Sequence, residues 1–155
     1  MRKEDSVHNY ILFVCTGNTC RSPMAAAIFN SYAERENKHW FAISAGLATE
    51  SGLPVTPEAK EALAAVGINL EDHRSRQLDK KMMKDAKIVL TMTATQRDLL
   101  HIYYPDKAEK IFTICEFIGS EQDIKDPYGG SLEIYQETAG ILISAMPYIL
   151  KNLTN

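Results

Sequence analysis

Short apolar segments alternate with helix-like segments along most of this 155-residue chain. Apolar runs at residues 10–14, 41–44, 88–92 and 110–115 indicate strands, and segments 23–36, 57–66, 95–103 and 131–153 indicate helices. The runs at 10–14 and 88–90 show no polar alternation, which is typical of strands buried on both faces. The pattern predicts an α/β fold of the Rossmann-like kind, a four-stranded parallel sheet with helices on both faces.

Length and charge limit the classes of function. The length suits a single domain over residues 1–155, in which residues 1–8 are expected to be a flexible polar extension. The formal net charge is −3, and the lysine-rich segment 80–84 is expected to be the solvated face of a helix, so no nucleic-acid partner is predicted.

Apolar segments and cysteines bear on location. No apolar run approaches the roughly 18 residues of a membrane span, and the start of the chain lacks the apolar core of a signal peptide. We therefore expect no membrane association and a cytoplasmic location. Three cysteines, an odd number, suit a reducing compartment better than a framework of structural disulfides.

The segment between the first predicted strand and helix, residues 15–22, reads Cys-Thr-Gly-Asn-Thr-Cys-Arg-Ser. We call it the anion loop. Backbone N–H groups in a turn that opens a helix bind anions, and the helix dipole adds partial positive charge there. Because open α/β sheets bind ligands outside the carboxyl ends of their strands, this loop is predicted to be a phosphate site.

Cys15 and Arg21 carry the predicted chemistry of this loop. A thiol close to a helix N-terminus and an arginine favours the thiolate form, which is the nucleophile. The planar guanidinium of Arg21 can hold two phosphate oxygens and stabilise the charge that develops during transfer. A free cysteine is often only a small buried apolar residue, but a cation at a helix N-terminus opposes the dipole unless an anion offsets it.

The other loop residues are predicted to shape the site or to contact substrate: Thr16, Gly17, Asn18, Thr19, Cys20 and Ser22. Gly17 and Asn18 are residue types that tolerate positive φ, which turns N–H groups inward. Ser22 is expected to cap the following helix, to donate a hydrogen bond to the Cys15 thiolate, or to do both. Cys20 either fills core volume or forms a reversible disulfide with Cys15 that shields it from over-oxidation.

The spacing of Cys15, Arg21 and Ser22 resembles the signature loop of cysteine-based phosphatases. Its place after the first strand is similar to the low-molecular-weight protein tyrosine phosphatase family, as are segments 44–46, 73–78, 90–100 and 126–130, in the same order. The resemblance implies that family's fold, a phosphocysteine intermediate, phosphorylated proteins as partners and no cofactor. It also favours the Ser22 hydroxyl as a donor to the thiolate.

Segment 126–130, Asp-Pro-Tyr-Gly-Gly, supplies the remaining candidates. Its composition alone indicates a turn, and a bare tyrosine is more often core filler. A carboxylic acid beside the loop can, however, protonate a leaving group and then take a proton from the water that attacks the phosphocysteine. In the family that it resembles, this aspartate is the general acid. Asp126 is therefore the predicted acid, and Tyr128 a predicted wall for the substrate's planar group.

Thr19 distinguishes between substrates. Tyrosine-selective family members commonly carry an aliphatic residue there, whereas this loop and the Asp126 segment look like those of the bacterial protein-arginine phosphatases. A threonine can orient the donor-rich guanidinium of phosphoarginine, which an aliphatic wall would leave without a partner. An aromatic wall residue is expected after Gly46, but the chain has Leu47, so Tyr128 is left as the ring. The predicted substrate is phosphoarginine in proteins, and phosphotyrosine is the alternative.

Two more distant functions fit less well. An arsenate reductase of similar fold would need a downstream pair of redox cysteines, but only Cys115, expected to end a strand in the core, lies outside the anion loop. An inactive anion-binding module would lack the nucleophile or the acid, and this chain has both. The four histidines are scattered without ligand spacing, so no metal is predicted.

Overall fold

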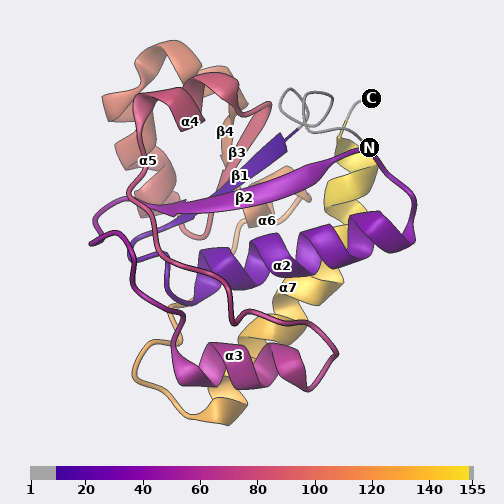
Figure 1. The fold of residues 1–155 in the computed structure, drawn as a ribbon. Helices are drawn as coiled ribbons and strands as arrows, with labels where there is room; N and C mark the ends of the chain where they lie inside the picture. The colour runs from indigo at the N-terminus through magenta and orange to yellow at the C-terminus, as the bar shows by residue number, and fades with distance from the viewer. Residues whose placement is uncertain (1–9, 154–155) are drawn as a thin grey trace.

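A computed structural model describes residues 10–153 of the chain, so the extension predicted at residues 1–8 lies outside the described part (Figure 1). Within it, four parallel strands form one sheet in the order β2-β1-β3-β4. The strands are β1 (Tyr10–Cys15), β2 (Phe41–Gly46), β3 (Ile88–Thr91) and β4 (Ile111–Thr113). The prediction of a four-stranded parallel sheet is confirmed.

Helices cover both faces of this sheet (Figure 1). One face is covered by α2 (Arg21–Arg35), α3 (Pro57–Ala64), α6 (Ile114–Phe117) and α7 (Leu132–Asn152). The other is covered by α4 (Lys80–Asp85) and α5 (Ala94–Tyr103), and a short 3-10 helix, η1 (Pro105–Lys110), follows α5. In the described range, 10–153, no helix is both long enough and apolar enough to cross a membrane.

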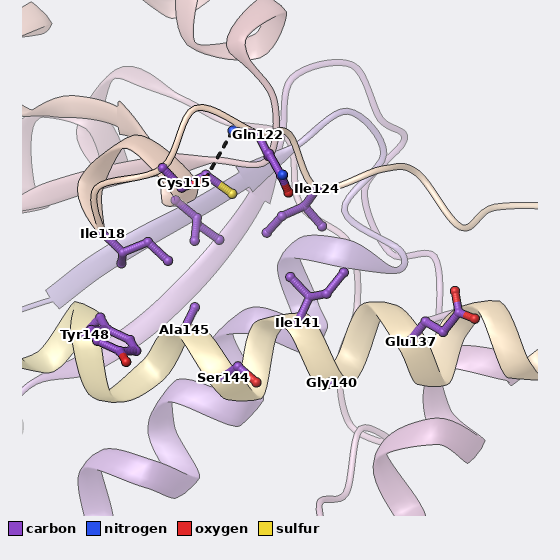
Figure 2. Close-up of a pocket in the computed structure, with 12 residues that line it drawn as sticks. Cys115, Ile118, Gln122, Ile124, Glu137, Gly140, Ile141, Ser144, Ala145 and Tyr148 are labelled. Atoms are coloured by element: carbon purple, nitrogen blue, oxygen red, sulfur yellow. Dashed lines mark hydrogen bonds between the residues drawn. The ribbon is translucent and has the colours of Figure 1, made fainter.

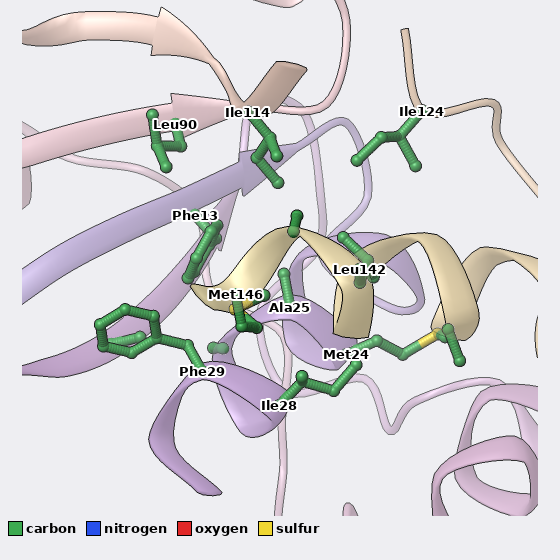
Figure 3. Packing of buried hydrophobic residues seen from close by; sticks show 14 of the residues in the cluster. Phe13, Met24, Ala25, Ile28, Phe29, Leu90, Ile114, Ile124, Leu142 and Met146 are labelled. Atoms are coloured by element: carbon green, nitrogen blue, oxygen red, sulfur yellow. The ribbon is translucent and has the colours of Figure 1, made fainter. Parts of the chain in front are cut away.

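The central strand β1 is buried along its whole length because its side chains enter two cores in turn. Ile11 and Phe13 belong to the larger core, between the sheet and α2, α3 and α7, whereas Leu12 and Val14 belong to the smaller core beneath α4 and α5. In the larger core Phe13 meets Phe29 of α2 edge-on, with ring centroids 6.0 Å apart (Figure 3). Full burial of each such side chain contributes about 1.5–3 kcal/mol.

Residues 110–115 do not form the single strand that was expected. β4 ends at Thr113, and Cys115 lies in α6. The reason is a capping box: the Glu116 N–H donates to Thr113 Oγ1, and the Thr113 N–H donates to Glu116 Oε1, both at 2.9 Å. Such reciprocal bonds start a helix at once. The prediction that Cys115 ends a strand is therefore wrong, although the residue is buried.

The strand order changes direction beside β1. The chain passes from β1 to β2 on one side and then crosses to β3 on the other side of β1. Such a reversal of direction leaves room for ligands outside the carboxyl ends of the strands. Cys15, the last residue of β1, lies at this point.

Candidate active site

The anion loop makes a sharp turn between β1 and α2. Asn18 has a φ of 57°, in the left-handed region, whereas Gly17 does not adopt a positive φ. The expectation of positive φ is thus met at Asn18 and wrong at Gly17. One left-handed residue suffices for this turn, and asparagine tolerates that conformation when its side chain is hydrogen-bonded locally.

Asn18 is fully buried and connects the anion loop to β2 and to segment 73–76. Its Nδ2 donates to Ser22 Oγ at 2.8 Å and to Ser44 Oγ at 2.9 Å, and its Oδ1 accepts from the Arg76 N–H at 2.9 Å. Its carbonyl oxygen lies 2.9 Å from His73 Nε2. Because a carbonyl oxygen only accepts, His73 Nε2–H is the donor, and burial is the main cause that lowers the pKa of this histidine. Hydrogen bonds from residues outside the anion loop, in β2 and in segment 73–76, therefore hold it in place.

Two groups converge on Cys15. Its Sγ lies 2.9 Å from Ser22 Oγ and accepts from the Asn18 N–H at 3.2 Å. Because Ser22 Oγ already accepts from the Asn18 amide, its own proton is available for the sulfur. Hydrogen bonds to sulfur favour the charged thiolate. The capping alternative for Ser22 is wrong, since Cys20 is the N-cap residue of α2 and no side chain caps the helix.

Arg21 is buried at the start of α2, with 4% of its surface exposed. Its Nη1 donates to the Ile124 carbonyl at 2.9 Å, and its Nη2 lies 3.7 Å from Asp126 Oδ2. Among residues 10–153, its Nε is buried without a hydrogen-bond partner. A buried guanidinium N–H without a hydrogen-bond partner lowers the stability of the fold, and an anion held by the loop would accept its hydrogen bond.

Asp126 lies at the mouth of the anion loop, with about half of its side chain exposed. The Tyr128 N–H donates to its Oδ1 at 3.0 Å, which holds the carboxylate in a tight turn. Tyr128 itself is 71% exposed, so the core-filler alternative is wrong. The structure thus brings Cys15, Arg21 and Asp126 to one place, as the prediction requires.

Cys20 belongs to the larger core, and its Sγ lies 3.7 Å from Asp126 Oδ1. Burial, reinforced by nearby Cys15 and Asp126, raises the pKa of Cys20 to about 12, so this sulfur stays a thiol. In this structure Cys20 fills core volume, which is the first of its two predicted roles. Both cysteines are free, and a disulfide between Cys15 and Cys20 stays a prediction.

The two loop threonines are held by different neighbours. Thr16 is exposed, and its Oγ1 accepts from Gln96 Nε2 at 3.1 Å. Thr19 is half-buried, and its carbonyl accepts from the Thr56 N–H at 2.9 Å. Six residues that support the site were not assigned that role from the sequence: Ser44, Thr56, His73, Arg76, Gln96 and Ile124. Gln96 could have been found from the sequence, because a threonine followed three residues later by a glutamine is the pattern of a capping box, which Thr93 and Gln96 form.

Gly46 is required by close packing against the anion loop. A Cβ at this position would lie 2.8 Å from the Thr16 carbonyl oxygen and 2.9 Å from Thr49 Cγ2. We expect Gly46→Ala to lower the free energy of unfolding by about 1–3 kcal/mol, measured by urea denaturation. Gly17→Ala is the control, because its nearest contact would be an ordinary 3.6 Å to Thr19 Oγ1. Equal stabilities of the two variants would contradict this account.

A cavity of about 770 Å³ lies away from the anion loop, between α6, α7 and segment 118–124 (Figure 2). Its apolar walls include Cys115, Ile118 and Ile141, and none of the predicted site residues lines it. Ile124 joins the two places: its side chain lines the cavity, and its carbonyl accepts from Arg21.

Comparison with known proteins matches residues 10–155 to the family described as low molecular weight phosphotyrosine protein phosphatase. A protein-arginine-phosphatase of Bacillus subtilis is 41% identical over 144 residues, which covers 92% of this chain and 95% of the relative. A second protein-arginine-phosphatase, from Geobacillus stearothermophilus, is 42% identical over 130 residues and covers 81% of this chain and 83% of the relative.

Solved structures agree with these matches. A low molecular weight protein tyrosine phosphatase from T. tengcongensis superposes with a TM-score of 0.91 at 44% identity, covering 94% of this chain and 99% of the other. A cysteine-to-serine mutant of the YwlE arginine phosphatase, with a phosphorylated active-site serine, gives a TM-score of 0.90 at 40% identity, covering 93% and 95%.

Proposed function

The chain belongs to the low molecular weight phosphotyrosine protein phosphatase family, and from that membership we propose that it removes phosphate from phosphoarginine residues in proteins. The observation that carries the proposal is the anion loop itself. Two donors converge on Cys15 Sγ, and the buried Arg21 guanidinium beside it has one N–H without a partner among the described residues. A thiolate and an unsatisfied cationic donor in one cup suit attack on a bound phosphoryl group.

In the first step, the Cys15 thiolate attacks phosphorus while loop N–H groups and Arg21 hold the non-bridging oxygens. An S–P bond forms as the bond from phosphorus to the guanidine nitrogen breaks, and Asp126 supplies the proton that the leaving nitrogen needs. Asp126 at the mouth of the cup, beside Arg21, suits that role.

In the second step, the Asp126 carboxylate takes a proton from water, whose oxygen attacks the phosphocysteine. The S–P bond breaks and inorganic phosphate leaves, which restores the thiolate. The Ser22 hydroxyl stabilises the departing sulfur, 2.9 Å away. A relative whose active-site cysteine is replaced by a phosphorylated serine supports a covalent route.

Thr19 supports phosphoarginine over phosphotyrosine. The bond from Thr56 to its carbonyl fixes its backbone, and its Oγ1 lies near Gly17 within the loop. A hydroxyl there can accept from one guanidinium N–H, and a carboxyl oxygen of the half-exposed Asp126 can accept from another. A phenol ring needs neither group.

The test is Thr19→Ile, which we expect to shift the ratio of kcat/KM for matched phosphoarginine and phosphotyrosine peptides toward phosphotyrosine by about 5- to 150-fold. The reason is that an isoleucine leaves guanidinium donors without a partner. Thr95→Ile is the control, because Thr95 is an exposed threonine of α5 outside the anion loop, and it should leave the ratio unchanged. A wild type that prefers phosphotyrosine, with a ratio that Thr19→Ile does not alter, would establish the tyrosine phosphatase alternative.

We also propose partners, a cellular location and a domain extent for this phosphatase. We propose phosphorylated proteins as partners, as the names of the relatives indicate for those proteins. A reducing cytoplasm would keep Cys15, Cys20 and Cys115 as the free thiols observed. We also propose that residues 1–155 form one domain, which the family match over residues 10–155 supports.

A further inference from the structure

Residues 92–96, which comprise the turn after β3 and the first residues of α5, contact both halves of the candidate active site. On one side, Gln96 Nε2 donates to Thr16 Oγ1 of the anion loop at 3.1 Å. On the other side lies segment 118–130, which carries Asp126 and which we call the acid loop. The Ala94 N–H donates to Asp123 Oδ1 of this loop at 2.9 Å.

The turn has a well-determined shape of its own. Gln96 is buried, and its Oε1 accepts from the N–H groups of Met92 and Thr93 at 3.0 and 3.1 Å. The Gln96 N–H donates in return to Thr93 Oγ1, which completes the capping box at the start of α5. A turn with its donors satisfied in this way is a rigid support.

The acid loop, in contrast, is held near Asp126 by few bonds. The Ile124 N–H donates to the Met92 carbonyl at 2.9 Å, and the Ile124 carbonyl accepts from Arg21. The carboxylate of Asp126 is half-exposed and lies 3.7 Å from the Arg21 guanidinium, too far for a strong ion pair. The Tyr128 N–H holds the carboxylate within its own turn, so the position of that turn over the anion loop depends on the anchors upstream, among which Asp123 supplies the one made by a side chain of the acid loop.

We propose that Asp123 is a positioning residue for the general acid. Its carboxylate ties the acid loop to the N-terminus of α5, where the helix dipole favours a negative charge, and so keeps Asp126 over the anion loop. The inference rests on the proposed function in that Asp126 is taken as the acid. It assigns Asp123 no contact with substrate.

The test is Asp123→Ala, measured on two aryl phosphates. Because kcat/KM reports the steps up to departure of the leaving group, it should fall by about tenfold on phenyl phosphate, whose phenolate needs the proton. On p-nitrophenyl phosphate, whose leaving group needs little help, it should fall by less than about threefold. Inhibition by inorganic phosphate should change by less than about twofold, because the anion loop keeps its own bonds.

Three companion variants sharpen the result. Asp123→Asn keeps an oxygen that accepts from the Ala94 N–H and should restore both rates to within about twofold of wild type. Glu121→Ala removes an exposed carboxylate from the same loop and should change neither rate. When Asp126→Asn is already present, adding Asp123→Ala should lower kcat/KM by less than about twofold, because no acid remains to be positioned.

The proposal is overturned if Asp123→Ala slows both substrates equally, weakens phosphate inhibition as much as it slows turnover, or has no effect. Failure of Asp123→Asn to restore the rates would overturn it as well. Hydrolysis of these aryl phosphates does not depend on a preference for phosphoarginine, so an error in the proposed substrate would be seen only in kcat/KM for the peptides. If Asp126 is not the acid, the loss of rate in Asp126→Asn will be the same for leaving groups of low and high basicity.

Discussion

Cys15→Ser is expected to bind inorganic phosphate almost as tightly as the wild type and to lose at least about 10³-fold in turnover. The loop N–H groups and the Arg21 guanidinium hold the anion, and the substitution leaves them in place. A serine hydroxyl is not ionised by the two donors that surround this position. Calorimetric titration with phosphate and steady-state rates on p-nitrophenyl phosphate measure the two properties separately.

The same variant should also trap a phosphoryl group. A related cysteine-to-serine mutant carries phosphate on its active-site serine, and a phosphoserine lacks the good sulfur leaving group of the second step. Intact-mass measurement after incubation with substrate would detect it. Cys115→Ser is the matched control, since that buried thiol lies in α6 and should leave turnover intact. Turnover by Cys15→Ser within about tenfold of wild type would refute the covalent mechanism.

Asp126→Asn is expected to slow hydrolysis of a phosphoarginine peptide by about 10²–10⁴-fold. The amide cannot donate the proton that the leaving guanidine needs or accept one from the attacking water. Stability should change little, because the carboxylate is half-exposed and its contact with Arg21 is long. The measurement is kcat/KM across leaving groups of graded basicity, together with a urea unfolding curve.

The loss in Asp126→Asn should grow as the leaving group becomes more basic. Glu133→Gln, an exposed carboxylate in the first turn of α7, is a control for the change of charge and should leave kcat/KM unaffected. Equal losses for good and poor leaving groups would remove Asp126 from the role of acid. The ionic contact with Arg21 would then be its remaining contribution.

Much of the fold could be predicted because its signals are local. The strand at residues 10–15 is apolar throughout since it enters two cores, and that pattern is visible without coordinates. The anion loop was also visible, because a cysteine, an arginine and a strand-to-helix junction fall within eight residues. The strand predicted through Cys115 failed because a capping box between Thr113 and Glu116 outweighed the apolar run.

Support for the site could not be predicted, because it comes from hydrogen bonds between distant segments. Sequence shows that Asn18 tolerates positive φ, but not that its amide reaches Ser44 or the Arg76 N–H. Ser44 and Arg76 lie 26 and 58 positions from Asn18, beyond the range of any periodic pattern.

These distant contacts bear on how the enzyme folds. The anion loop is bonded to residues 58, 80 and 103 positions away, through Arg76, Gln96 and Ile124. Because closing such long stretches of chain is entropically costly, we expect the phosphate cup to be complete only when nearly the whole chain has reached its native arrangement. Phosphate then binds the native state alone and raises the free energy of unfolding with its concentration, which makes the ligand a reporter of complete folding.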